Sequence, residues 1–270
     1  EHPERWPEVL ATMAANGVEH ALCVSVNLED WPDMMTLVGR HAGLLSASVG
    51  VHPDYLDVAE PTVAQLVQLA MHPQVVAIGE TGLDYYRMPA AELDWQRERF
   101  RVHIRAAREA GKPLIIHTRA AAEDTMRLLR EEGAGAAGGV MHCFTEDWEI
   151  ARQALDIGFY ISMSGIVSFK KATTVHEVAR RVPADRLLIE TDSPFLAPVP
   201  YRGKQNQPGW VAHVAEAVAA LRQVPVGEIG RITTENYDRL FGRGRPAAGV
   251  IPANTRIHGP GGDECTHGPS

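Results

Sequence analysis

The sequence has little cysteine: Cys23, Cys143 and Cys265 are the only three in 270 residues, and no Cys-x-x-Cys pair occurs. An odd number of widely separated thiols indicates neither a disulfide framework nor a thiolate zinc site. We therefore expect a reducing, cytoplasmic location. Apolar runs of about 18 residues, the length needed to cross a bilayer, are also absent, and no signal peptide opens the chain, so we expect no membrane partner.

Basic charge is in deficit. The chain carries 26 Lys and Arg against 34 Asp and Glu, a formal net charge of −8, so no overall positive field attracts nucleic acid. An anionic substrate is still compatible with this charge, because bound divalent cations can reverse the local potential. Hydrophobic residues make up 45% and charged residues 22%, the composition of a folded globular protein. No apolar patch is obvious in the sequence, and we expect a monomer.

Short apolar runs alternate with helical patterns along most of the chain. This alternation is typical of βαβ units in a parallel sheet. We expect one α/β hydrolase domain over residues 1–242, followed by a Gly- and Pro-rich, disordered tail over residues 243–270. The predicted strands are Ala21–Val26, Leu45–Gly50, Val75–Glu80, Leu114–His117, Val140–His142, Phe159–Ser162 and Leu187–Thr191.

The strand count is compatible with a TIM-type (β/α)8 barrel whose first strand is missing, and the candidate site residues described below favour this interpretation. A closed barrel of this type has eight strands, and the sequence supplies seven, beginning with a helix. An open, doubly wound sheet is the alternative on the count alone. If the first strand has been lost, one strand with its loop corresponds to roughly fifteen to twenty residues.

Metal-ligating side chains lie at the ends of four predicted strands. Glu80, His117 and His142 end their strands, and Asp192 directly follows another. The carboxyl ends of barrel strands meet at one face, where active sites are assembled from different strands. Imidazole and carboxylate groups together suit Zn²⁺, Mn²⁺ or similar ions, and Mg²⁺ where oxygen ligands dominate. We assign no role to the other histidines at helix edges, such as His103, and expect them to be exposed.

Several local strings resemble the TatD family of metal-dependent deoxyribonucleases, in order, over about residues 1–242. They are Gly50-Val51-His52-Pro53, the segment from Ile78 to Tyr86, Ile116-His117-Thr118-Arg119, Met141-His142-Cys143-Phe144-Thr145, Ser164-Gly165, Phe169-Lys170-Lys171-Ala172, Glu190-Thr191-Asp192-Ser193-Pro194 and Thr234-Glu235-Asn236.

The resemblance implies an amidohydrolase-type barrel that uses one or two divalent ions, typically Mg²⁺ or Mn²⁺. By likeness, Glu80 would bridge the ions and His117 and His142 would hold one of them. Asp192 would bind the other ion and act as the general base. The implied reaction is the removal of nucleotides from the 3′ ends of single-stranded DNA. We therefore expect catalytic roles for Asp192 and Glu80 and a nucleic-acid partner.

Substrate contacts are expected at five further positions: His52, Tyr86, Arg202, Lys204 and Asn206. The last three form a polar loop suited to phosphate contact. The family usually shows Arg-Gly-Lys-Arg-Asn-Glu-Pro there, so the glutamines at positions 205 and 207 replace one cation and one carboxylate. The family also begins with a strand carrying His-x-His, and no His-x-His occurs in this sequence.

Two other functions remain open from the sequence. The same metal centre could hydrolyse an ester or amide, as in D-aminoacyl-tRNA deacylation, which would make tRNA the partner. Alternatively, a barrel without the His-x-His strand would bind metal or nucleic acid without turnover.

Overall fold

The strands form one parallel sheet in the order of the chain. A computed structural model describes residues 5–242, and the expected tail over residues 243–270 lies outside these residues. The sheet order is β1-β2-β3-β4-β5-β6-β7, with every neighbouring pair parallel. The strands are β1 Ala21–Cys23, β2 Leu45–Val49, β3 Val75–Asp84, β4 Leu114–Arg119, β5 Gly139–Met141, β6 Tyr160–Met163 and β7 Leu187–Ile189.

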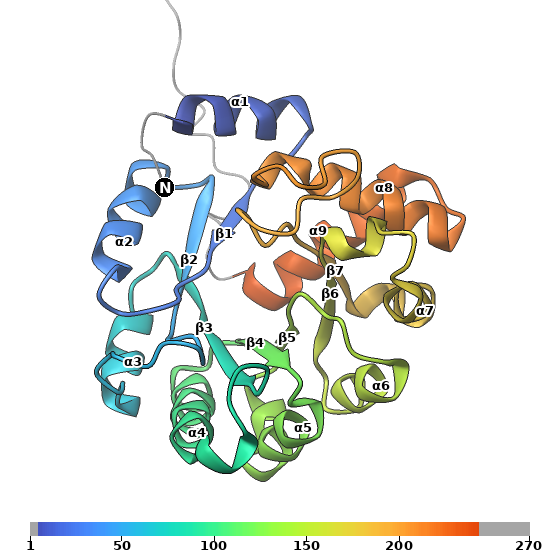
Figure 1. The fold of residues 1–270 in the computed structure, drawn as a ribbon. Helices are drawn as coiled ribbons and strands as arrows, with labels where there is room; N and C mark the ends of the chain where they lie inside the picture. The colour runs from blue at the N-terminus through green and yellow to red at the C-terminus, as the bar shows by residue number, and fades with distance from the viewer. Residues whose placement is uncertain (1–4, 243–270) are drawn as a thin grey trace, which may run out of the picture.

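Helices surround the curled sheet (Figure 1). They are α1 Trp6–Ala15, α2 Trp31–Arg40, α3 Val63–Ala70, α4 Asp94–Ala110, α5 Ala122–Glu131, α6 Trp148–Asp156, α7 Thr173–Arg181, α8 Val211–Arg222 and α9 Val226–Phe241. The architecture confirms the predicted (β/α) barrel type with seven strands. Within residues 5–242, the sheet is open between β1 and β7. None of the helices in this range is both long and apolar enough to cross a membrane.

Two apolar clusters stabilise the fold. The larger one lies between the sheet and the surrounding helices, where Ile78, Leu114 and Ile116 pack with Phe100. The smaller one includes Ile115, whose side chain points to the opposite face of β4 from its two neighbours because strand side chains alternate. Phe241 of α9 packs in this second cluster. The interior is therefore filled with side chains, as in other barrels of this type.

The strand β3 is longer than predicted. The sequence placed its end at Glu80, but the strand continues to Asp84 because Gly82, Leu83 and Asp84 pair with the outer half of β4. The register between β3 and β4 shifts between Ile78 and Thr81. Such an irregularity re-aims the side chain next to it, and here that side chain is Glu80.

Candidate metal centre

Glu80 forms the middle of the site. Its side chain is 9% exposed. One oxygen, Oε1, lies 2.8 Å from Nε2 of His142, 3.2 Å from Nδ1 of His117 and 3.5 Å from Nε2 of His52. Burial alone would raise the pKa of this carboxyl, but the charge of His142 and hydrogen bonds from His117 and His142 lower it well below its ordinary value. Glu80 is therefore an anion in contact with three imidazole rings.

His117 is oriented by a second carboxylate. It lies within β4, and its Nε2 atom donates to Oδ2 of Asp84, 3.0 Å away, at the end of β3. Asp84 is 3% exposed and also accepts a hydrogen bond from the backbone N–H of Tyr86. Burial would lower the pKa of His117, but the hydrogen bonds to Asp84 and Glu80 raise it. The Nδ1 atom of the ring therefore points to Glu80.

His142 also lies between Glu80 and a second carboxylate, but here Nε2, not Nδ1, faces Glu80. Its backbone N–H donates to the carbonyl oxygen of Ile116, which places it directly after β5. Nε2 faces Glu80, and Nδ1 lies 2.9 Å from Oε1 of Glu190. The carboxylates at both ring nitrogens overcome burial and raise the pKa of His142 well above its ordinary value. A carboxylate behind a histidine ring is the usual companion of a metal-ligating imidazole.

Asp192 follows β7 and lies beside this pair. His142, Glu190 and Asp192 each offer a ligand atom within 4.8 Å of the others. The backbone of Asp192 is left-handed, with φ of 57°, a conformation that Asp tolerates better than most residues. Burial raises the pKa of Asp192 to about 6 despite the opposing charge of His142. The predicted convergence of the four side chains at one rim is thus observed in the structure.

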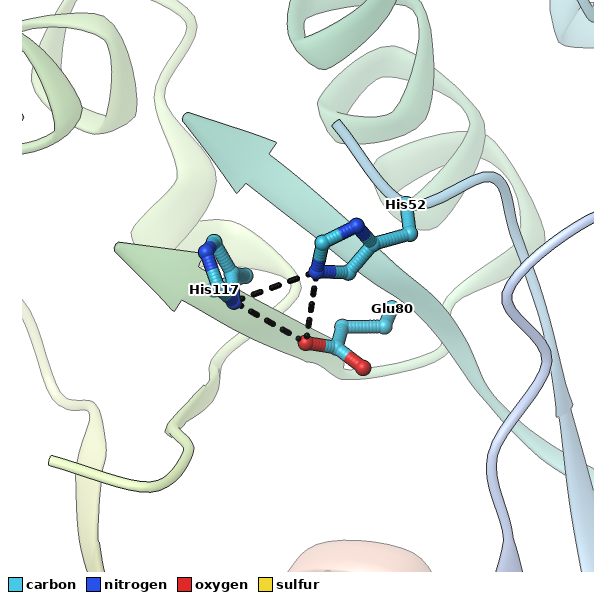
Figure 2. Close-up of side chains that lie close together, drawn as sticks. All are labelled: His52, Glu80 and His117. Atoms are coloured by element: carbon cyan, nitrogen blue, oxygen red, sulfur yellow. Dashed lines mark hydrogen bonds and ion pairs between the residues drawn. The ribbon is translucent and has the colours of Figure 1, made fainter. Parts of the chain in front are cut away.

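A divalent cation fits this donor set. His117 and His142 direct ring nitrogens to one oxygen of an ionised, buried Glu80, and each ring has a carboxylate behind it. Neutral imidazole nitrogens with carboxylate oxygens suit Zn²⁺, Mn²⁺ and related ions. A bound cation would take the place of the protons that His117 and His142 share with Glu80. His52, Glu80 and His117 form a second possible group (Figure 2).

The expected substrate contacts lie in different environments. Tyr86 is 65% exposed, and the guanidinium of Arg119 stacks 3.7 Å from the centre of its ring. Arg202 lies over the ring of Phe169 at 4.4 Å, and Lys204 is exposed 5.4 Å from the ring centre of Tyr201.

Asn206 does not have the environment expected of a substrate contact. It is 4% exposed, and its amide donates to the carbonyl oxygens of Thr191 and Phe195 while its oxygen accepts from the N–H of Gln207. All its polar atoms are therefore bound within the protein. Asn206 holds the loop that carries Asp192, rather than presenting its amide at the surface.

Sequence reasoning missed a row of buried polar residues on α4. Gln96, Arg99 and His103 share one helix face, at spacings of three and four residues. Gln96 bonds the backbone of both Pro53 and Asp84, while Arg99 donates to the carbonyl oxygens of His52 and Tyr55.

His103 corrects an expectation made from its position on a helix edge. It is fully buried, accepts from the N–H of Val51 at Nε2 and donates from Nδ1 to the carbonyl oxygen of Arg99. Its place between the apolar residues Phe100 and Ala107, with Ile104 beside it, was the available signal. Asp84 and Glu190 were also missed as orienting groups, although both lie in the strings Gly-Leu-Asp-Tyr and Glu-Thr-Asp-Ser-Pro.

Comparisons with known proteins give a consistent relationship. A family model described as TatD related DNase matches residues 2–242. The uncharacterized metal-dependent hydrolase YcfH of Escherichia coli K12 is 51% identical over 235 residues, which cover 87% of each chain. The 3′-5′ ssDNA/RNA exonuclease TatD of Klebsiella pneumoniae is 32% identical over 241 residues, covering 87% of this chain and 91% of that protein. The crystal structure of YjjV, a TatD homolog from E. coli, superposes with a TM-score of 0.81 at 25% identity, covering 87% of this chain and 91% of that one.

Proposed function

Because the chain belongs to the family of TatD-related DNases, we propose that it is a divalent-metal-dependent hydrolase that removes nucleotides from the 3′ ends of single-stranded DNA. The observation that carries the proposal is the meeting of His117 and His142 at one oxygen of Glu80, with Asp192 beside them. When bound, divalent ions would neutralise the phosphoryl oxygens and make water a better nucleophile.

The four side chains of the candidate metal centre would have different roles. Glu80, His117 and His142 would hold one cation, and Asp192 would contribute a carboxylate to a second and accept the proton of the attacking water. With a pKa raised to about 6 by burial, Asp192 is a stronger base than an ordinary aspartate and is still mostly ionised at pH 7. Nearby cations would lower this pKa and keep the carboxylate charged.

The rim around the site supports a nucleic-acid substrate. In the first cation–aromatic pair, Tyr86 follows β3 and Arg119 is the last residue of β4. In the second pair, Phe169 lies in the segment after β6 and Arg202 in the segment after β7. In the sheet order, these two cation–aromatic pairs flank β5, which His142 directly follows. Aromatic faces stack with unpaired bases, contributing about 1–3 kcal/mol for each base, and guanidinium groups bind phosphates. The pairs thus offer local positive charge in a chain whose net charge is −8.

A labelled oligonucleotide tests the proposal. Incubation with Mg²⁺ or Mn²⁺ and single-stranded DNA labelled at its 5′ end should give a ladder of shortened labelled products, and EDTA should abolish it. Glu80→Gln should lose at least about 100-fold of the rate, since it removes the central anion of the site. Glu177→Gln, which removes an exposed carboxylate on α7, is the matched control and should keep the wild-type rate.

A D-aminoacyl-tRNA assayed beside the DNA separates the alternatives. Release of the amino acid without DNA shortening would replace the nuclease assignment by an esterase one. Metal binding with neither activity would leave a binding protein and contradict the proposed hydrolysis.

A further inference from the structure

His52 occupies a position from which it could be counted as a third histidine ligand. It follows β2, and its Nε2 atom lies 3.3 Å from Nδ1 of His117 and 3.5 Å from Oε1 of Glu80. Figure 2 shows the ring directed toward both side chains. Donor atoms bound to one cation have similar separations, so distance alone does not distinguish a ligand from a neighbour. The position of the ring proton does.

The proton of His52 is located by its other nitrogen. The backbone N–H of Asp54 donates to Nδ1 at 3.1 Å, so Nδ1 must present a lone pair. A neutral imidazole carries one proton, and it must therefore be on Nε2. The ring is neutral because the nitrogen that accepts from the N–H of Asp54 carries no proton. The nitrogen that faces the metal centre is thus a donor.

His117 and His142 have the opposite arrangement. In each, the nitrogen away from Glu80 donates to a carboxylate, Asp84 for His117 and Glu190 for His142. When such a ring is neutral, its proton stays with that carboxylate, and a lone pair faces the centre. Only a lone pair can bind a cation. Of the three rings around Glu80, two are therefore prepared as ligands, and His52 is prepared as a hydrogen-bond donor.

The backbone around His52 is held in place. Arg99, whose side chain is 1% exposed, donates to the carbonyl oxygens of His52 and Tyr55 and forms an ion pair with Glu60. His103 accepts the N–H of the preceding residue, Val51. Turning the ring of His52 to expose a lone pair at Nε2 would also leave the N–H of Asp54 without its acceptor. The donor orientation is therefore built into the loop.

We propose that His52 is not a metal ligand but donates a hydrogen bond from Nε2 to a non-bridging oxygen of the phosphate that is cleaved. This role rests on the proposed phosphodiesterase function. The proton remains on Nε2 throughout, so no proton transfer is involved. A fixed donor at a phosphoryl oxygen favours the transition state, where negative charge on that group must be stabilised, and removal of such a donor typically costs about 100- to 1,000-fold in kcat.

Two amide variants separate donor from ligand. His52→Gln places an amide NH₂ near the position of Nε2 and preserves a donor, whereas His52→Asn reaches only to the position of Nδ1. We expect both to bind Mn²⁺ with wild-type stoichiometry and with affinity within about threefold, by titration calorimetry. With single-stranded DNA, His52→Asn should lose about 100-fold in kcat, and His52→Gln should recover at least about tenfold of that loss. His117→Ala, which removes the ring nitrogen that faces Glu80, should lose Mn²⁺ affinity.

The outcomes are distinct. Loss of Mn²⁺ in both His52 variants would make His52 a ligand and overturn the inference, as would equal kcat values for the wild type and His52→Asn. Nitrogen-15 NMR of the Mg²⁺-loaded protein should show the Nε2–H tautomer, and an Nδ1–H tautomer would contradict it.

If the wild-type protein has no nuclease activity, the proposed function fails, and binding of inorganic phosphate to the metal-loaded protein replaces the kinetic measurement. Phosphate should then bind about tenfold more weakly to His52→Asn than to His52→Gln. Equal binding would overturn the donor role independently. Melting curves of both variants check that they are folded.

Discussion

Glu190 holds His142 from behind: Oε1 of Glu190 lies 2.9 Å from Nδ1 of His142, on the opposite side of the ring from Glu80. Burial would raise the pKa of Glu190, but the charge and hydrogen bond of His142 lower it, so Glu190 accepts as an anion. The pair sets which nitrogen of His142 faces the candidate metal centre. Through this contact, Glu190 positions the ring of His142.

Replacing Glu190 should weaken metal binding without removing a ligand. Glu190→Ala should raise the Kd for Mn²⁺ by about 10- to 100-fold, because the ring loses its fixed orientation. Glu190→Gln should have a smaller effect, since an amide oxygen can still accept from Nδ1. Calorimetry measures both, and Glu149→Ala, which removes an exposed carboxylate on α6, is the control. Wild-type affinity in Glu190→Ala would show that the contact does not orient the ring.

Metal binding should release protons. In the metal-free protein, the pKa of His142 is raised well above its ordinary value, because carboxylates at both nitrogens outweigh burial. The ring is therefore protonated at pH 7, and Nε2 must lose its proton before it can bind a cation. If one proton is released on binding, the affinity for Mn²⁺ should fall by about tenfold for each pH unit below the pKa of His142.

Two buffers of different ionisation enthalpy measure this release. The apparent binding enthalpy of Mn²⁺ at pH 7 should differ between them in proportion to the number of protons taken up by the buffer. Identical enthalpies would mean that His142 is already unprotonated in the metal-free site.

Gly82 allows β3 to approach β4 closely beside His117. Its φ is 141°, and an added Cβ would lie 1.9 Å from the carbonyl oxygen of His117. Gly82→Ala should therefore destabilise the protein by about 3 kcal/mol or more and displace His117. Gly230→Ala is the matched control: it lies inside α9 with nothing within 4 Å of an added Cβ, and it should stabilise by about 0.5–1 kcal/mol. Urea unfolding measures both, and a mild effect at Gly82 would contradict the close approach.

His103 should make the metal-free protein less stable in acid. Burial lowers its pKa in the folded state to about 4, against an ordinary value of 6.5. Between these two pH values the unfolded chain binds the proton and the folded protein does not. Stability is therefore fully present above pH 6.5 and is lost as the pH falls toward 4, by an amount on the order of 3 kcal/mol.

A double comparison isolates this contribution. The loss of unfolding free energy between pH 7.5 and pH 5 is measured by urea for the wild type and for His103→Gln, both in EDTA. The wild type should lose more than the variant. Equal losses would show that His103 is already protonated in the folded protein.

The sequence predicted which side chains meet at the candidate metal centre better than it predicted what orients them. Glu80, His117, His142 and Asp192 could be found because parallel strands bring their carboxyl-terminal parts to one face, so that side chains in or after those parts become neighbours. The pairing of His117 with Asp84 could not be found in this way. It depends on the extension of β3 beyond Glu80, which is set by its pairing with β4. Pairing between strands is a tertiary property that residue patterns do not encode locally.

The sequence also did not indicate which polar residues are buried. His103 was expected to be exposed because histidine on a helix is usually a surface residue, and Asn206 was expected to contact substrate because it lies in a polar loop. Both are buried because backbone N–H or C=O groups of neighbouring loops need partners there. These partners belong to segments distant in the sequence. Their identity follows only from the folded chain.

One helix, α4, contacts the segments that carry His52 and Asp84. Through Gln96, α4 binds the backbone of Pro53, next to His52, and that of Asp84, which orients His117. A rigid displacement of α4 would therefore move both loops in concert, and phosphate contact and cation affinity would change together. Substitutions that shift α4 would therefore alter the proposed phosphate contact of His52 and the cation affinity of the site together. Substitutions on α6 or α7 would not act through these contacts of Gln96.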